Sequence, residues 1–207
     1  MILFVETNFV LELAFGQEEH ASCRALVNLA EGNDALSLAL PAYCVGEAYG
    51  RQIRRQRERE ALQRRLAAEL GELSRSPTHA RRLEEVGEVM SLLAESAEEE
   101  RQRLESVLGE LYATATLIPL DESVAREAHR QQRRRGLGPQ DALVYASVLN
   151  HLRRSGGGGL PAGSESCFVT RDNDFADEDV RADLEGLGCR LLFRFRDALG
   201  YVRSRLP

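Results

Sequence analysis

Acidic side chains recur where short apolar runs end or where helices are predicted to begin. Glu6 ends the apolar run 1–5, and Glu47 lies in the first turns of a helix that follows the run 35–41. Asp141 follows a Gly-Leu-Gly-Pro turn and opens another helix. The sequence FVTRDNDF then places Asp172 and Asp174 directly after a further apolar run. Carboxylate oxygens at such positions are the ligands that Mg²⁺ and Mn²⁺ prefer.

The chemistry depends on whether these acids meet. The carboxyl ends of the strands in an open parallel sheet lie at one edge, where ligands bind. Three or four carboxylates gathered there repel one another unless a cation joins them. Such a cluster is therefore costly as pure structure and favourable as a metal site, and the pattern predicts one.

Each acid taken alone also has an ordinary interpretation. Glu6 and Asp141 suit the first turn of a helix, where the helix dipole favours negative charge. Glu47 alone reads as a solvated helix residue, and Asp172 with Asp174 reads as a turn, which Asp favours. The metal hypothesis rests on the shared position of all of them at one predicted sheet edge.

Five short apolar runs alternate with helical patterns along the chain. The predicted strands are 1–5, 35–41, 116–120, 167–170 and 189–193. The predicted helices begin near Val10 and cover 17–30, 43–70, 121–135, a segment from Asp141 onward, 179–187 and the C-terminus. Strands that alternate with helices predict an α/β fold with a parallel sheet.

A long charged region interrupts this alternation. Between about 51 and 112, Arg and Glu interleave with Leu at helical spacing, which predicts a helical hairpin or arm. Ser76-Pro77-Thr78 predicts the break between its two helices, because Pro and Thr favour a helix start. A glycine run at 155–159 predicts a flexible loop.

Four segments together resemble the PIN-domain nuclease family, which includes the VapC-like ribonucleases. The segments are FVETNFVLEL, PAYCVGEAYG, GPQDALVYASVL and FVTRDNDF, and they occur in the family's order across about 1–50 and 116–195. The resemblance implies one domain over 1–207 with a three-layer α/β/α architecture and a central parallel sheet. Residues 51–115 would form a helical insertion that no family motif covers.

The resemblance implies metal-dependent hydrolysis of phosphodiester bonds in RNA. Mg²⁺ or Mn²⁺ would lower the pKa of a water that attacks phosphorus in line, a second ion would stabilise the leaving 3′-oxygen, and the products would carry 5′-phosphates. Glu6, Glu47, Asp141 and Asp172 are the predicted catalytic metal ligands. Asp174 is predicted to support these ligands or to replace one, and Asn8 and Thr170 to orient the carboxylates by hydrogen bonds.

Glu6 departs from the family pattern, in which the first acid is usually Asp. The additional methylene displaces the carboxylate, so a second hypothesis is a weakened PIN-like module that binds RNA or a protein. A third hypothesis, an unrelated α/β phosphohydrolase, is disfavoured because the first strand ends in Glu-Thr-Asn and lacks a D-x-D nucleophile. The family also implies a toxin role with an antitoxin or other protein partner, and a homodimer.

The basic residues are all arginine, 27 in number, in a chain of net charge −6. Arginine binds phosphate in a bidentate manner, although a compositional bias toward arginine explains the overall count equally well. The cluster Arg130, Arg133, Arg134 and Arg135 precedes Asp141 without interleaved acids and is the predicted nucleic-acid contact. A second arginine-rich helical stretch begins at Arg51, and its arginines from Arg57 to Arg65 are interleaved with Glu and read as a solvated helix face.

Composition excludes several other classes of protein. The longest apolar run is far shorter than a membrane span, and the N-terminus lacks the basic start of a secretory signal. The four cysteines show neither zinc nor disulfide spacing. These features predict a soluble, cytoplasmic protein.

Overall fold

A computed structural model describes residues 1–75, 84–156 and 165–206. The predicted helix break at 76–78 and most of the glycine run at 155–159 lie outside these residues.

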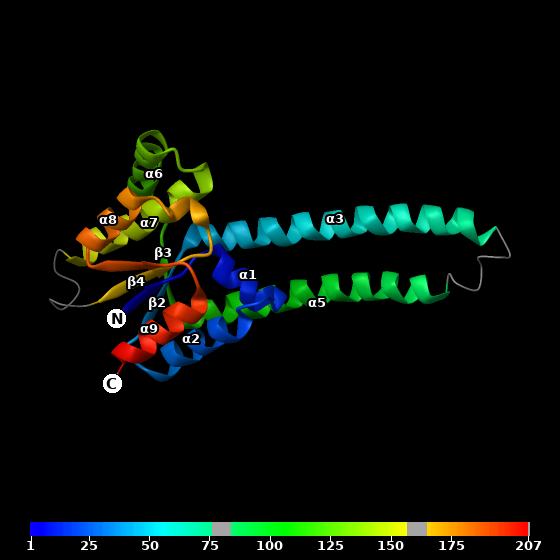
Figure 1. The fold of residues 1–207 in the computed structure, drawn as a ribbon, viewed down its shortest axis with the longest axis horizontal. Coiled ribbons are helices and arrows are strands. Elements are labelled where there is room, and N and C mark those ends of the chain that lie inside the picture. Colours follow the sequence, from blue (N-terminus) through cyan, green and yellow to red (C-terminus); the bar gives the residue numbers. More distant parts are fainter. Residues whose placement is uncertain (76–83, 157–164, 207) are drawn as a thin grey trace.

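A five-stranded parallel sheet forms the centre of the protein, in the order β3-β2-β1-β4-β5. Its strands are β1 (Ile2–Phe4), β2 (Ser37–Pro41), β3 (Ala115–Ile118), β4 (Ser166–Val169) and β5 (Cys189–Leu192). Helices α6, α7 and α8 lie over one face, and α2 and α9 lie over the other (Figure 1). The predicted three-layer α/β/α architecture with a parallel sheet is confirmed.

The central strand, β1, is buried on both faces. Leu3, Phe4 and Val5 are completely buried, and Phe4 is in register with Ala39 of β2 and with Phe168 of β4. This continuous apolar character is expected for a parallel strand that helices cover on both sides. Because parallel strands end at the same edge, the residues that follow β1, β2 and β4 converge there.

The helix bounds differ from the predicted ones by a few residues. The helices are α1 (Thr7–Phe15), α2 (His20–Gly32), α3 (Ala42–Ser74), α5 (Glu84–Thr114), α6 (Glu122–Arg135), α7 (Pro139–Gly156), α8 (Glu178–Gly186) and α9 (Phe195–Arg205), with a 3-10 turn η1 at Asn173–Phe175. The first helix begins at Thr7 because the Glu6 carboxylate accepts a hydrogen bond from the Asn8 backbone N–H, which caps the helix.

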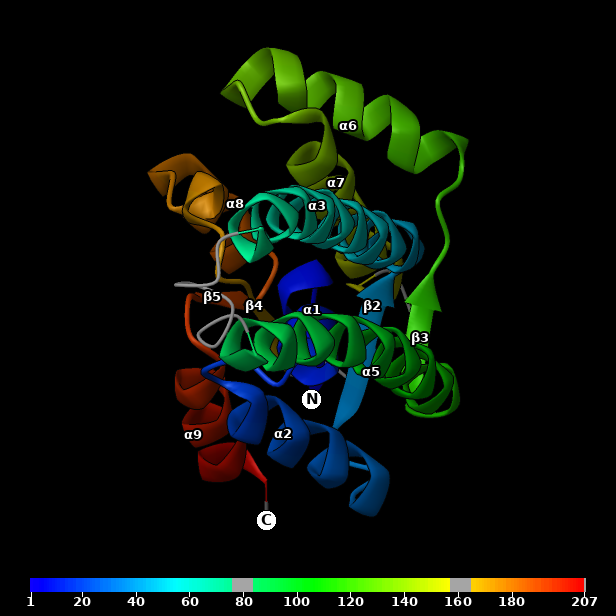
Figure 2. The same cartoon turned by 90° about the vertical axis from the view of Figure 1, so that its right-hand side faces the viewer.

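Two long helices form the predicted arm. Helices α3 and α5 run side by side and extend well beyond the carboxyl edge of the sheet (Figures 1 and 2). Glu100 of α5 is only 7% exposed and binds two arginines of α3. Arg59 donates through both terminal nitrogens, at 2.9 and 2.7 Å, and Arg55 also pairs with Glu100 and lies over the Phe15 ring.

The root of the arm belongs to the hydrophobic core. The C-terminal half of α5 buries Leu104, Val107, Leu108 and Leu111 in the same cluster as the sheet. The first turns of α3 likewise bury Cys44 and Ala48. The C-terminal end of the 51–115 region therefore packs into the same core as the sheet. No helix within the described part of the chain is both long and apolar enough to cross a membrane.

The Glu100 cluster predicts a large loss of stability when Glu100 is replaced by Ala. Removal of one partner from a mostly buried ion pair leaves the others without compensation, so we expect the free energy of unfolding to fall by about 3 kcal/mol. Glu99→Ala is the control, since Glu99 is exposed and lies 3.7 Å from its arginine partner. Urea unfolding measures both; equal midpoints for the two variants would contradict the prediction.

Candidate active site

A cavity of about 220 Å³ opens at the carboxyl edge of the sheet. It lies where β1, β2 and β4 end and where α1, α3 and α7 begin, so five carboxylates from distant parts of the chain reach it. They belong to Glu6, Glu47, Asp141, Asp172 and Asp174. Asn8, Arg51 and Gln140 also line the cavity. The expected convergence of the acids is therefore present.

Three aspartates form the tightest group. Asp141, Asp172 and Asp174 each place a carboxylate oxygen within 4.8 Å of those of the other two. The β4–η1 loop fixes two of them, because the Thr170 hydroxyl accepts from the Asp172 backbone N–H at 2.9 Å, and Asp172 Oδ1 accepts from the Asp174 backbone N–H at 2.9 Å. Thr170, which is fully buried, thus holds the loop that carries both acids.

Glu6 and Glu47 line the same cavity. Glu6 is 5% exposed; its Oε2 caps α1 at 2.7 Å, whereas its Oε1 is buried and has no hydrogen-bond partner among the described residues. Glu47 Oε2 accepts from the Thr7 hydroxyl at 2.6 Å, and its Oε1 lies 3.7 Å from an Arg51 nitrogen. The Thr7 hydroxyl thus orients the Glu47 carboxylate, and the second oxygen of that carboxylate faces Arg51.

The electrostatics of the cavity disfavour negative charge. Burial raises the pKa of Glu6 from 4.5 to about 7, even though the Asn8 hydrogen bond opposes this rise. The pKa of Asp141 rises from 3.8 to about 6, mainly because of burial and next because of the neighbouring carboxylates, Asp172 most among them. A divalent cation would compensate these charges and satisfy the unpartnered Glu6 oxygen. The donor set, oxygen atoms of carboxylates, fits Mg²⁺ or Mn²⁺.

Gly138 leaves room for the Asp141 side chain. A Cβ at Gly138 would lie 2.9 Å from Asp141 Oδ2, closer than real Cβ contacts. The Gly-Leu-Gly-Pro turn thus determines both where α7 begins and where the Asp141 carboxylate can lie.

The predicted arginine cluster lies apart from this cavity. Arg135 is turned inward, with its side chain 2% exposed and ion-paired to Asp183, Asp177 and Asp179. Arg130 pairs with Glu127, one turn earlier on α6. Arg133 and Arg134 are exposed. No acid interrupts the cluster in the sequence, but acids of α6 and of the α8 region pair with Arg130 and Arg135 in the fold.

Sequence reasoning missed several side chains beside the acids. The sequence indicated no role in the site for Thr7, which donates to Glu47, or for Arg51, which lines the cavity. Arg171 pairs with Glu12, which is 1% exposed. The available signal was that Glu12 stands alone among apolar residues on a short helix, which marks a buried charge in need of a partner.

The parallel sheet and the acid-lined cavity at its carboxyl edge define an α/β protein of nuclease type. A model of the PIN domain matches residues 3–175. The match covers most of the chain, which therefore belongs to the PIN domain family, and the resemblance seen in the four sequence segments is confirmed. Searches of curated proteins and of solved structures found no match.

Glu6→Gln is expected to stabilise the metal-free protein at high pH. A carboxyl whose pKa is raised from 4.5 to about 7 on folding destabilises the folded state above that range, by about 3 kcal/mol. The amide can still accept from Asn8 but carries no charge. Denaturant unfolding in EDTA should therefore show the variant to be more stable at about pH 8, with the advantage shrinking toward about pH 5. A variant less stable than wild type at the higher pH would contradict this.

Proposed function

We propose that the protein is a metal-dependent endoribonuclease that hydrolyses phosphodiester bonds with Mg²⁺ or Mn²⁺. The observation that supports this most is the group of three aspartate oxygens within 4.8 Å of one another, in a cavity that also contains the buried, unpartnered Glu6 oxygen. The choice of RNA follows from the family resemblance.

Asp141, Asp172 and Asp174 would hold the ion, together with Glu6 and Glu47 of the same cavity. When bound, Mg²⁺ or Mn²⁺ lowers the pKa of water and stabilises charge on the phosphate oxygens. Asp174 is thereby assigned a ligand role equal to that of Asp172, because its oxygen lies as close to the group.

The remaining side chains of the cavity would position the acids and the phosphate. Thr7 fixes Glu47 through its hydroxyl, and Thr170 fixes the loop that carries Asp172. Arg51 lines the cavity and is half exposed, with only a 3.7 Å contact to Glu47. Its guanidinium is therefore available to a phosphate oxygen of the substrate.

The toxin role, the antitoxin partner, the homodimer and the cytoplasmic location stay predictions from the family resemblance and the composition. Coexpression with the product of a neighbouring reading frame tests the partner, and light scattering of the purified protein tests the dimer.

Asp141→Asn is expected to abolish cleavage. The wild type should cut generic single-stranded RNA in Mn²⁺ and leave it intact in EDTA, and Asp141→Asn should lower the rate by about 100-fold or more, because a ligand for the ion is lost. Asp34→Asn, in an exposed turn before β2, is the matched control and should cleave like wild type. Equal cleavage by both variants would rule out the proposed site.

The same assay separates the nuclease from the binding-module hypothesis, which Glu6 favours because its longer side chain replaces the usual Asp. Glu6→Asp should cleave faster than wild type if the additional methylene is a handicap. A wild type that binds RNA but never cleaves it, with any metal and with either acid at position 6, would support the binding module.

Gly138→Ala is expected to weaken metal binding by about 10-fold, the lower range seen when groups that position a ligand are disturbed. The new methyl group would push Asp141 Oδ2 from its place. Gly200→Ala is the control, since no atom lies within 4 Å of a Cβ there. Mn²⁺ titration followed by electron paramagnetic resonance measures both affinities. Identical affinities would show that the Asp141 position does not matter for the ion.

A further inference from the structure

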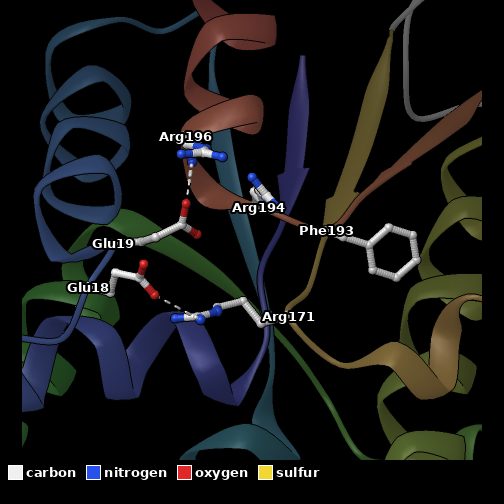
Figure 3. Close-up of a pocket in the computed structure, with 6 residues that line it drawn as sticks. All are labelled: Glu18, Glu19, Arg171, Phe193, Arg194 and Arg196. Atoms are coloured by element: carbon white, nitrogen blue, oxygen red, sulfur yellow. Dashed lines mark hydrogen bonds and ion pairs between the residues drawn. The ribbon is translucent and has the colours of Figure 1, made fainter.

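The acid-lined cavity continues into two further hollows. The second, of about 520 Å³, shares Asn8, Asp172 and Asp174 with the first. The third, of about 280 Å³, shares Arg171 with the second (Figure 3). The shared residues place the three hollows next to one another, in an order that leads from the aspartates past Arg171 to the start of α9; this row of hollows is called the groove below.

Two of the three acids along the far part of this groove, Glu12 and Glu19, are engaged within the protein, whereas Glu18 is 82% exposed and has a 3.4 Å contact to Arg171. Glu19 accepts from the Phe195 backbone N–H at 2.8 Å and from that of Arg196 at 3.5 Å, so its charge lies at the N-terminus of α9. Glu12 is buried, pairs with Arg171 and accepts from the Glu19 backbone N–H at 2.8 Å. These contacts compensate the negative charges of Glu12 and Glu19. Arg171 is likewise already engaged, because it pairs with Glu12.

Two arginines at the far end are not so engaged. Arg194 has no ion-pair or hydrogen-bond partner for its side chain within the described part of the chain, and it is exposed. Arg196 is 60% exposed and lies 3.8 Å from the neighbouring Asp197. Both side chains line the third hollow (Figure 3). Exposed guanidinium groups that line a groove favour an anionic ligand from outside when, as here, one has no side-chain partner and the other has only a long contact to an exposed neighbour.

An aromatic residue directly precedes these two arginines in the sequence. Phe193 lines the same hollow and is only half-buried, and its ring points away from Glu18, Glu19 and both arginines (Figure 3). No other aromatic ring stacks on it among the residues that the structure describes. Proteins that bind single strands combine aromatic rings, on which bases stack, with cationic side chains that contact phosphates.

We propose that this end of the groove is a binding subsite for the substrate strand, with Arg194 and Arg196 on backbone phosphates and Phe193 on a base. The subsite positions a single strand so that a neighbouring phosphate lies at the acid-lined cavity. This inference rests on the proposed nuclease function. It adds that the bound form of the substrate is a single strand, held by named residues outside the acid-lined cavity.

The test measures binding without cleavage. An Asp141→Asn background in EDTA is titrated against a labelled single-stranded RNA of about 12 nucleotides, with fluorescence anisotropy recorded over about 50 to 200 mM salt. We expect Arg194→Gln/Arg196→Gln to weaken binding about tenfold and to reduce the slope of log affinity against log salt by about 1.4, the value for two single-strand phosphate contacts.

Two matched variants decide whether the effect is local. Arg64→Gln/Arg65→Gln removes the same charge from an exposed face of α3 and should leave the affinity nearly unchanged. Phe193→Leu should weaken single-strand binding about fivefold with no change in salt slope, and leave binding of a duplex of equal length unchanged. Equal losses from the two arginine pairs would indicate bulk charge, and either that result or full binding by Arg194→Gln/Arg196→Gln would overturn the proposal.

Failure of the subsite and failure of the nuclease assignment are distinguishable. Binding is measured without metal and without an active site, whereas cleavage is measured with the wild type in Mn²⁺. A wild type that cleaves while Arg194→Gln/Arg196→Gln binds normally removes the subsite and keeps the nuclease. Circular dichroism of each variant confirms folding, which is expected because both arginines are exposed.

Discussion

The fold brings together several carboxylates that repel one another, and this repulsion is the main constraint on the site. Parallel strands end at one edge, so the acids after β1 and β4 and those on the helices after β2 and β3 approach one another whatever their charge. Burial and proximity then raise the pKa values of Glu6 and Asp141. A protein keeps such an arrangement when a ligand compensates for it, and oxygen donors in this number favour a hard divalent ion.

The arm and the cavity share a helix. Glu47 lies in the second turn of α3, and the same helix continues beyond the edge of the sheet to form half of the arm (Figure 1). The Arg55, Arg59 and Glu100 contacts hold the two arm helices together near this edge. Displacement of the arm root would therefore move Glu47 relative to the aspartates, which gives the buried cluster a role in the geometry of the site.

A second network supports the loop that carries Asp172. Glu12 of α1 binds Arg171, and the Glu12 and Glu19 carboxylates accept backbone N–H groups of the α1–α2 turn and of α9. These contacts join segments that are more than one hundred residues apart in sequence. The loop that carries Asp172, helix α1 and helix α9 are thus held together. Residues of these three segments also line the groove that leads to Arg194.

The sequence by itself determined the parallel α/β fold, the arm and the edge at which the acids meet. Strand and helix periodicity are local properties, and parallel topology sends every strand end to one side. Only the tertiary structure decided which cations are available: it buried Arg135 among three aspartates, paired Arg171 with Glu12, and left Arg194 and Arg196 exposed beside Phe193. It also brought Asp174 into one group with Asp141 and Asp172. The physical reason is that an arginine finds its partner through packing between distant elements, which no spacing along the chain records.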